Sequence, residues 1–547
     1  MTGLSPRALV LGALLGALLA ATAMYSGSRT SVVDGGNLPA ALLGLALLAP
    51  ARRRPTADEG NLIQTVASSA AYMAMTGGFL GPLAALALAG HAIPMVAATA
   101  WGVAVGVAGC LFAVPLRAAF VVRGRLPFPS ATAVATVIDA AYAQRTGGAR
   151  IRVLVAGALV AATVATMRDV LGWLPELTVL PITIAAVSGS SIALGVGWSP
   201  LLLAVGAMLG ARMALALVLG VIAAWVVLAP VLVGSGTVPE AGYLPLLSWL
   251  LWPGVGLMLG GTLAALLASW RTLRAGLREL DELRPGRGYL IALGLVVLAV
   301  VVLGDRALGV SPAISALALG LAAILCAAAG QATGETDNTP AGAFGGLGQL
   351  VVGAIAPGGV AAPLAAGGVI QGTVMHASVM LGNWRTGLRL GAAPGPQLVA
   401  QLVGVVVGAI TSAAVFELMR RTTGLATQAM PAPIAQSWRA TAEVVSHGWA
   451  ALPAHAGLAA AIAMVSGLAL ARAQRRVAWL PSPVALGMAF VLPPYVSLTM
   501  ALGALGFAIL GRVRPAWSQA HAATLASGAI AGEAIIGLVA AAGALLG

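Results

Sequence analysis

Charged side chains are scarce in this chain, and one kind is missing altogether. Only 8% of the 547 residues are charged, against roughly 25% in a soluble domain, and none of the 29 basic residues is a lysine. So few polar groups cannot cover a water-exposed surface, which excludes an ordinary soluble fold. Without lysine there is no G-x-x-x-x-G-K-[ST] loop, so ATP-driven transport through such a motif is also excluded.

Cysteine and histidine are almost as rare. Cys110 and Cys326 each lie in an apolar run, without a CxxC spacing or a nearby histidine. Neither a disulfide framework nor a zinc site is indicated, and we expect two packed thiols, no bound metal and no cofactor. Nucleic acid is not an expected partner, because an excess of arginine in a membrane chain usually encodes topology.

What is abundant is apolar sequence, because 60% of the residues are hydrophobic. A membrane-crossing helix needs about 20 apolar residues, and the runs allow about 16 of them. We therefore predict an all-α, polytopic integral membrane protein whose main partner is the lipid bilayer. Residues 62–90 and 178–198 each favour a single span, whereas residues 479–511 contain the helix-breaking sequence Leu492-Pro493-Pro494.

Pairs of glycines four residues apart recur inside the apolar runs. Such pairs allow two membrane helices to approach closely, so we predict helix contacts at each of them. The pairs are Gly12/Gly16, Gly102/Gly106, Gly206/Gly210, Gly256/Gly260 and Gly404/Gly408.

Three landmarks recur at nearly one spacing and indicate an internal repeat. Gly60-Asn61 and Gly334-Glu335 stand 274 residues apart, Pro127 and Pro394 stand 267 apart, and Ser199-Pro200 and Ser482-Pro483 stand 283 apart. We predict an N-terminal transmembrane repeat at 1–270, an arginine-rich cytoplasmic linker at 271–287 and a C-terminal transmembrane repeat at 288–547. The alternation of arginine clusters predicts a cytoplasmic N-terminus. We expect the protein to lie in the inner (plasma) membrane.

Uncharged polar residues at helical spacing suggest where a substrate could bind. Asn61, Gln64 and Thr65 fall at i, i+3 and i+4, so they share one helical face. Their amides could bind varied peptide main chains, although hydrogen bonds between helices would explain them equally well. Asn338 and Thr339 are predicted to take the corresponding place in the second half. His376, embedded in an apolar run, is either a substrate ligand or a packed core histidine.

Three carboxylates are candidates for carrying a coupling proton. Glu533 lies in an otherwise apolar run, beside small residues that allow close helix approach, and a buried charge is costly enough to suggest function. Pairing with an arginine to hold the bundle is the alternative. Glu335 and Asp337 lie in a glycine-rich segment, residues 330–348, which we expect to be non-helical; capping of the next helix would also explain them. Asp139 is a further candidate.

An enzyme must also be considered. Ser190 and Ser191 lie in an apolar run, and with His376 they superficially suggest an intramembrane serine protease, in which serine needs a histidine base. Small residues in a crowded helix explain the serines better. Glu443 and His447 have a spacing that could bind a metal, but their polar segment favours a solvated face.

Four stretches spread over nearly the whole chain carry short motifs: DEGNLIQTVAS at 58–68, LPFPSATA at 126–133, RTGLRLGAAP at 385–394 and ASGAIAGEA at 526–534. In this order they resemble the oligopeptide transporter superfamily, which includes the yellow-stripe-like metal-chelate transporters. The resemblance implies two repeated halves and a secondary active transporter. The expected activity is proton-coupled uptake of short oligopeptides or metal-chelate complexes across the cytoplasmic membrane, and transport of another small polar solute is an alternative.

Overall fold

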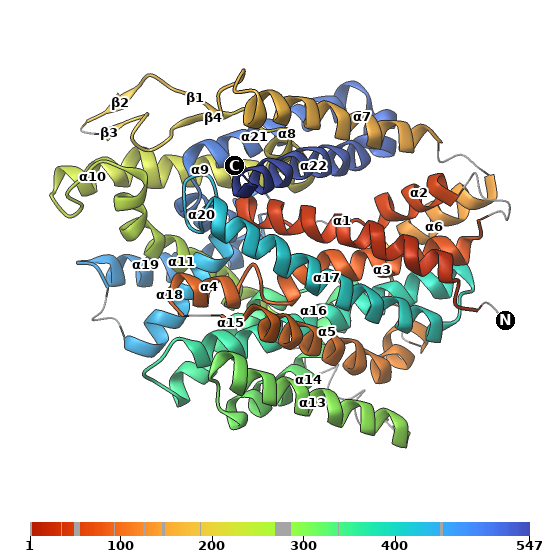
Figure 1. Ribbon diagram of the computed structural model, residues 1–547. Helices are drawn as coiled ribbons and strands as arrows, with labels where there is room; N and C mark the ends of the chain where they lie inside the picture. Colours follow the sequence, from red (N-terminus) through yellow and green to blue (C-terminus); the bar gives the residue numbers. More distant parts are fainter. Residues whose placement is uncertain are drawn as a thin grey trace. The chain divides into compact units, whose positions relative to one another are not determined.

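The computed structural model is built almost entirely of helices (Figure 1). It describes residues 3–33, 35–48, 55–91, 93–123, 126–144, 148–185, 187–268, 286–336, 339–448, 452–477 and 479–546. Within these ranges, 12 helices are long and apolar enough to cross a membrane, and three shorter apolar helices accompany them. The chain is therefore an all-α polytopic membrane protein, and the predicted fold class is confirmed.

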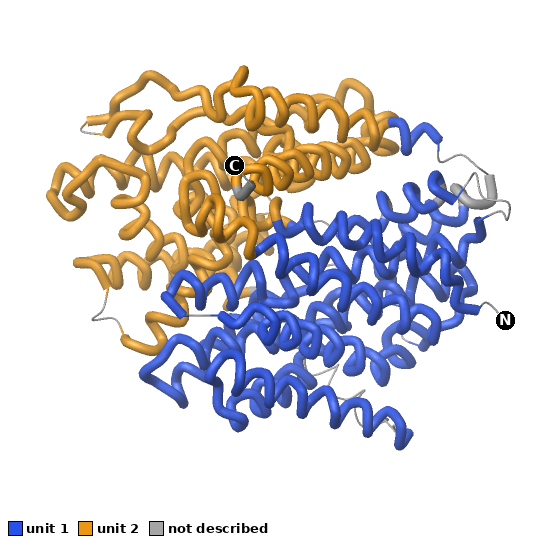
Figure 2. Tube along the Cα trace, viewed as in Figure 1, with its two compact units in different colours: residues 1–24, 33–152, 266–416 blue, residues 25–32, 153–265, 417–547 orange. Residues whose placement is uncertain are grey.

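The chain divides into two compact units, shown in different colours in Figure 2. Unit 1 comprises residues 1–24, 33–152 and 266–416, and unit 2 comprises residues 25–32, 153–265 and 417–547. Each unit draws on both of the halves that the repeat predicts. The repeat boundaries themselves stay a prediction, since most of the proposed linker lies outside the described residues.

The helices of unit 1 are α2 (Asn37–Leu48), α3 (Ala57–Thr76), α4 (Pro82–Leu88), α5 (Met95–Arg117), the π-helical η1 (Ala118–Arg123), α6 (Pro129–Gln144), α13 (Arg287–Leu308), α14 (Pro312–Thr336), α15 (Ala341–Ile355), α16 (Ala361–Leu390) and most of α1 (Pro6–Thr30) and α17 (Pro394–Thr422).

The helices of unit 2 are most of α7 (Gly148–Ala165) and of α11 (Tyr243–Ala268), the π-helical η2 (Thr166–Val170) and η3 (Ile222–Leu228), α8 (Pro200–Leu209), α9 (Ala211–Val221), α10 (Ala229–Gly234), α18 (Pro433–His447), α19 (Ala456–Gln474), α20 (Pro483–Val491), α21 (Pro494–Val513) and α22 (Pro515–Leu546). Its strands are β1 (Leu177–Val179), β2 (Thr183–Ile184), β3 (Val187–Ser188) and β4 (Gly195–Gly197).

Unit 1 is organised around α16. This helix packs against α3, α4, α5, α6, α14 and α15. In its most apolar stretch 89% of the residues are buried, whereas in that of α13, on the outside of the unit, only 11% are buried. A helix enclosed in this way can carry polar side chains that never meet lipid, because neighbouring helices satisfy them. The polar residues of α16 are therefore the first place to look for a site.

Glycine contacts hold α3 between two other helices of unit 1. Gly12 and Gly16 of α1 lie against Val66 and Ala70, and Gly404 and Gly408 of α17 lie against the α3 backbone on another side. A β-carbon on any of these glycines would meet α3 atoms within about 3 Å, so the helices approach as closely as the paired glycines predict. α3 is thus fixed in position.

Most of the predicted glycine contacts are confirmed, since the pairs at 102/106 and 256/260 also lie against neighbouring helices. Gly210 is the exception. It has a φ of +79°, has no atoms near its β-carbon position, and separates α8 from α9. Its value lies in the positive φ that only glycine adopts readily, not in helix packing.

Unit 2 contains two broken helices that pack against each other: one consists of α8 and α9, the other of α20 and α21. α8 packs against α21, and α9 packs against α20. Ser199 and Ser482 cap α8 and α20 in the same way, each accepting a hydrogen bond from the backbone N–H three residues later, with proline at the first helical position. The break predicted at Leu492-Pro493 is confirmed, because α20 ends there and α21 begins at Pro494.

Three sequence-based expectations about helices are wrong. Residues 178–198 do not form a span: β1 pairs antiparallel with β4 and β2 with β3. Pro181 and the glycines of this segment disfavour a helix, and its β-branched residues favour strands. Residues 62–90 are broken after Thr76, because Gly78 has a φ of +88°. The segment 330–348 is helical up to Thr336 and again from Ala341.

The glycine contacts between α8 and α21 generate a stability prediction. A β-carbon on Gly206 would collide with the Met500 backbone, and one on Gly503 with the Leu203 backbone. We expect Gly206→Ala and Gly503→Ala each to lower the free energy of unfolding by about 1–3 kcal/mol, because neither helix can move away without losing other contacts. Thermal unfolding in detergent measures this.

Gly506 is the matched control, since it lies on α21 with nothing near its β-carbon position. Gly506→Ala should leave the melting temperature unchanged or raise it, because alanine is favoured over glycine in a helix by about 0.5–1 kcal/mol. Equal melting temperatures for the Gly206 and Gly506 variants would contradict the packing described.

Candidate functional site

Unit 1 contains a buried network of amides and hydroxyls without a charged member. It joins α3, α16 and α17. We call it the amide–hydroxyl cluster, and its members are Asn61, Gln64, Thr65, Ser68, Ser69, His376, Asn383, Gln397 and Gln401, all of them buried.

The α3 end of the cluster has hydrogen-bonding groups to spare. The Thr65 hydroxyl donates to the Asn61 carbonyl at 2.7 Å, and Gln64 Nε2 donates to Asn61 Oδ1 at 3.0 Å. Asn61 Nδ2 and Gln64 Oε1 are buried and have no partner among the described residues. One amide donor and one amide acceptor are therefore presented side by side, and such groups are costly to bury unless something binds them.

Farther along, the cluster runs from α3 through α16 to α17. Asn383 Nδ2 donates to Gln401 Oε1 at 2.8 Å and to Ser68 Oγ at 3.3 Å, and Gln397 Nε2 donates to the Asn383 carbonyl at 2.7 Å. The Ser69 hydroxyl donates to the Gln401 carbonyl at 2.8 Å. These bonds tie three helices together through uncharged groups.

His376 closes the cluster at its other end. Gln401 Nε2 lies 3.4 Å from His376 Nδ1, and His376 Nε2 lies 2.9 Å from the Met73 sulfur. If Nδ1 accepts from the amide, Nε2 carries the proton and points it at the thioether, a weak acceptor. His376 is thus enclosed and uses both ring nitrogens within unit 1.

Unit 2 contains the opposite kind of site, a cluster of charges in which Arg29, Arg168 and Glu533 are buried and the two remaining carboxylates are exposed. We call it the arginine–glutamate cluster, and its members are Arg29, Arg168, Asp169, Glu176 and Glu533. Glu533 is 0% exposed. As its small neighbours predict, α22 lies close to α7: a β-carbon on Gly528 or Gly532 would collide with the α7 backbone.

The Glu533 carboxylate accepts hydrogen bonds from three separate segments of unit 2. Oε1 accepts from Arg29 Nη1 at 3.3 Å, Arg168 Nη2 at 3.0 Å and the Ser199 hydroxyl at 2.7 Å. Oε2 accepts from the Leu201 N–H at 2.8 Å, at the first turn of α8. This arrangement stabilises a negative charge in a place that bulk solvent does not reach.

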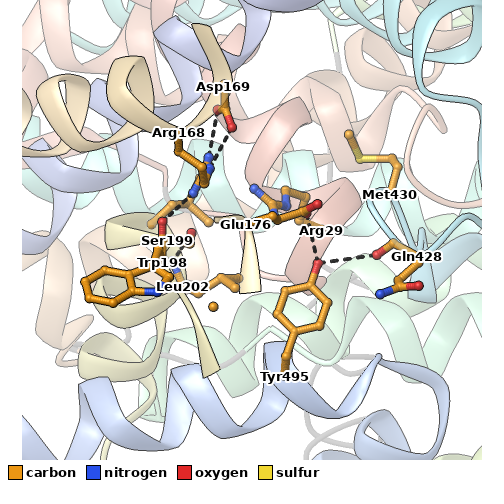
Figure 3. Close-up of polar contacts among 12 residues, drawn as sticks. Arg29, Arg168, Asp169, Glu176, Trp198, Ser199, Leu202, Gln428, Met430 and Tyr495 are labelled. Atoms are coloured by element: carbon orange, nitrogen blue, oxygen red, sulfur yellow. Dashed lines mark hydrogen bonds and ion pairs between the residues drawn. The ribbon is translucent and has the colours of Figure 1, made fainter. Parts of the chain in front are cut away.

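The two arginines differ in how fully they are used. Arg168 donates to both Asp169 oxygens, at 2.6 and 2.7 Å, and to the Trp198 carbonyl at 2.6 Å (Figure 3). Arg29 lies 3.7 Å from Glu176, whose side chain is 54% exposed, and its buried Nε has no partner among the described residues. Figure 3 also shows the Tyr495 hydroxyl beside Glu176, at 3.4 Å.

The other candidate carboxylates lie elsewhere. Glu335 is exposed at the end of α14 and accepts a hydrogen bond from Gln331. Asp337 and Asn338 lie outside the described residues. The Thr339 hydroxyl contacts that of Thr333 at 2.8 Å. Asp139 is exposed on α6.

The proposed metal spacing and the protease pair find no support in the described part of the chain. Glu443 pairs with Arg439 at 2.7 Å, and no group of three or more metal-ligating His, Cys, Asp or Glu residues occurs there. The Ser191 hydroxyl donates to the Ser188 carbonyl, and the two ring nitrogens of His376 contact Met73 and Gln401, so each member of the pair has other partners.

Sequence reasoning missed the partners of the residues that it found. Arg29 and Arg168 lie at the end of the first apolar run and inside a later one, where an arginine is expensive enough to require a carboxylate partner. Gln397 and Gln401 have the same i, i+4 spacing as Asn61 and Thr65. The sequence therefore contained a signal for both sets of partners: arginines within apolar runs, and two glutamines on one helical face.

The chain matches the family model described as OPT oligopeptide transporter protein over residues 3–544. A putative oligopeptide transporter of Haemophilus influenzae is 24% identical over 589 aligned residues, which cover 94% of this chain and 92% of the relative.

Two plant proteins match a shorter stretch. A probable metal-nicotianamine transporter of Arabidopsis thaliana is 32% identical and one of Oryza sativa subsp. japonica is 34% identical, each over 37% of this chain. The matched stretches span 30% and 31% of the lengths of these two relatives. All three relatives are described as transporters.

The amide–hydroxyl cluster generates a stability prediction. Gln401→Leu removes both side-chain amide contacts of Gln401 while keeping a similar volume, and it leaves Asn383 and His376 each short of a partner. We expect the free energy of unfolding to fall by about 1–3 kcal/mol, the usual cost of a stranded buried polar group. Thermal unfolding in detergent measures the change.

Ser412 provides the control. It is also buried on α17, but its hydroxyl has no partner among the described residues. Ser412→Ala removes a polar group that was already unsatisfied, so stability should be unchanged or slightly higher. A Gln401 variant as stable as the parent would show that the cluster does not hold these helices together.

Proposed function

The chain belongs to the oligopeptide transporter family, and we propose that it is a secondary active transporter of short peptides or metal chelates. The proposal takes its substrate classes from the relatives, which are described as an oligopeptide transporter and metal-nicotianamine transporters. We place the protein in the cytoplasmic membrane with its N-terminus in the cytoplasm, as the arginine distribution favours.

The observation that carries the proposal is the pair of free amide groups on α3. Asn61 Nδ2 and Gln64 Oε1 offer a donor and an acceptor in a buried, uncharged setting. A peptide group presents the complementary acceptor and donor, and so do the polar groups of many chelators. We propose that the amide–hydroxyl cluster, including Thr65 and His376, binds the solute, and that Asn338 and Thr339 contribute from the second half.

We further propose that uptake is coupled to protons and that Glu533 carries the proton. It is buried in a membrane helix, where a carboxylate that changes charge has large consequences for its surroundings. Asp337 comes second, because the adjacent Asn338 and Thr339 could orient it, and Glu335, which is exposed at the end of α14, comes third. Asp139 and His376 come next.

Uptake into proteoliposomes under an imposed pH gradient tests the function. We expect the protein to accumulate members of a short-peptide pool or of a metal-chelate pool, by up to about tenfold per pH unit if one proton accompanies each solute. Glu533→Gln should abolish accumulation and retain solute exchange across the membrane, because exchange needs no net proton movement.

The matched control is Glu59, another buried carboxylate paired with an arginine, Arg7, at 2.6 Å. It caps α3 together with Thr56. Glu59→Gln should lower the folding yield and leave the folded fraction able to accumulate solute. If neither pool is taken up by the parent, the transport proposal is wrong; if Glu533→Gln still accumulates solute as well as the parent, proton coupling through Glu533 is wrong.

A further inference from the structure

The donors around Glu533 come from elements other than the helix that carries it. Arg29 ends α1, Arg168 lies in η2, and Ser199 and Leu201 open α8, whereas Glu533 reaches them from α22. Two guanidinium groups, a hydroxyl and a helix N-terminal N–H are together the set that proteins use to bind a carboxylate or other oxyanion. These four donors therefore form a site that could bind any carboxylate group, whether it belongs to Glu533 or to another molecule.

The two arginines would respond differently if Glu533 lost its charge. Arg168 would keep its two short bonds to Asp169 and its bond to the Trp198 carbonyl. Arg29 would keep the 3.7 Å contact with half-exposed Glu176, a 3.4 Å contact with the Tyr25 hydroxyl and its interactions with the Tyr25 ring and with Tyr495, while its Nε already lacks a partner among the described residues. Arg29 is thus a buried cation whose compensation depends on Glu533.

We propose that Arg29, Arg168, Ser199 and the Leu201 N–H form a binding site for the carboxylate group of the transported solute, which Glu533 occupies while no solute is bound. The inference rests on the proposed transport function and names the chemical group that this site recognises. Free peptides end in a carboxylate, and carboxylates are common metal-chelating groups, so both substrate classes carry it.

Charge balance links this exchange to a proton. When the solute's carboxylate takes the place of Glu533 beside the arginines, an ionised Glu533 would add an uncompensated buried charge, so Glu533 takes up one proton from water as it is displaced. The buried charge is then the same before and after. By linkage, a proton on Glu533 tightens binding of the solute as much as the solute tightens binding of the proton.

The charged and titratable groups that face Glu533 are consistent with this exchange. α8 has no charged or titratable side chain and contributes only the Leu201 N–H. The other elements contribute both positive and negative groups. Arg29 of α1 and Arg168 of η2 contact Glu533 directly. The surrounding groups contact these arginines or each other: Tyr25 and Glu176 contact Arg29, Asp169 contacts Arg168, and Tyr495 of α21 contacts Glu176.

The test compares trialanine with trialaninamide, which differ only in the charge of the C-terminal group. Binding and exchange are measured in proteoliposomes at neutral and acidic pH. The parent should prefer the free carboxylate by about tenfold or more, as a charge-assisted hydrogen bond predicts, with the preference growing as the pH falls. In Glu533→Gln the preference should already be at its acidic-pH value at neutral pH, because the amide cannot compete as an anion.

Arg29→Gln should lose the preference for trialanine over trialaninamide while still exchanging both. Ser199→Ala, a milder change in the same donor set, should reduce the preference in case the arginine variant does not fold. Glu59→Gln should behave like the parent, because its ion pair with Arg7 lies in unit 1.

The outcomes separate this inference from the function on which it rests. Exchange of both peptides with equal affinity by the parent, or an unchanged preference in both donor variants, would overturn the carboxylate site and leave transport standing. Absence of exchange for either peptide and for the metal-chelate pool would overturn the proposed function, and the carboxylate site with it.

Discussion

The compensation of one buried carboxylate determines how unit 2 is put together. Glu533 accepts hydrogen bonds from the end of α1, from η2 and from the start of α8, so one carboxylate ties these three segments together. Burying a single uncompensated charge costs several kcal/mol, so the Glu533 carboxylate can be buried only together with its arginine partners. The glycines of α22 that allow its close approach to α7 serve the same arrangement, because they bring Glu533 within reach.

The amide–hydroxyl cluster of unit 1 meets the same constraint without charges. Its polar side chains lie on α3, α16 and α17, where neighbouring helices exclude lipid, and hydrogen bonds between amides and hydroxyls satisfy most of them. α3 is fixed by glycine contacts to α1 and α17, so the free groups of Asn61 and Gln64 have a defined position. Fixed, uncharged groups of this kind suit a neutral polar group of a ligand.

Much of this could be predicted from the sequence, because membrane helices leave strong signals. Apolar runs of the right length predicted the fold class, paired glycines predicted close contacts, and Leu492-Pro493 predicted a break. Glu533 stood out because a carboxylate in an apolar run is rare. The prediction of a span at residues 178–198 was wrong, since an apolar run of that length fits both a membrane helix and two short β-hairpin pairings. Only Pro181 and the glycines of the segment favoured the strands.

The partners were harder to predict than the residues themselves. Nothing in the sequence says that Arg29 and Arg168 meet Glu533 from positions more than 350 residues away, or that Asn383 meets Gln401. Such pairs are set by how helices pack, which spacing along one helix does not reveal. The division into repeated halves likewise stays a prediction, although the matching serine caps of α8 and α20 favour it.

Infrared difference spectroscopy on the purified protein tests most directly whether Glu533 exchanges its charge with that of the solute. Adding trialanine at constant neutral pH should produce the carbonyl band of a newly protonated buried carboxylic acid, together with uptake of one proton per bound peptide measured by a pH indicator. Both signals should be missing in Glu533→Gln and present in Glu59→Gln. A peptide-induced band that persists in Glu533→Gln, or binding without proton uptake, would contradict the account.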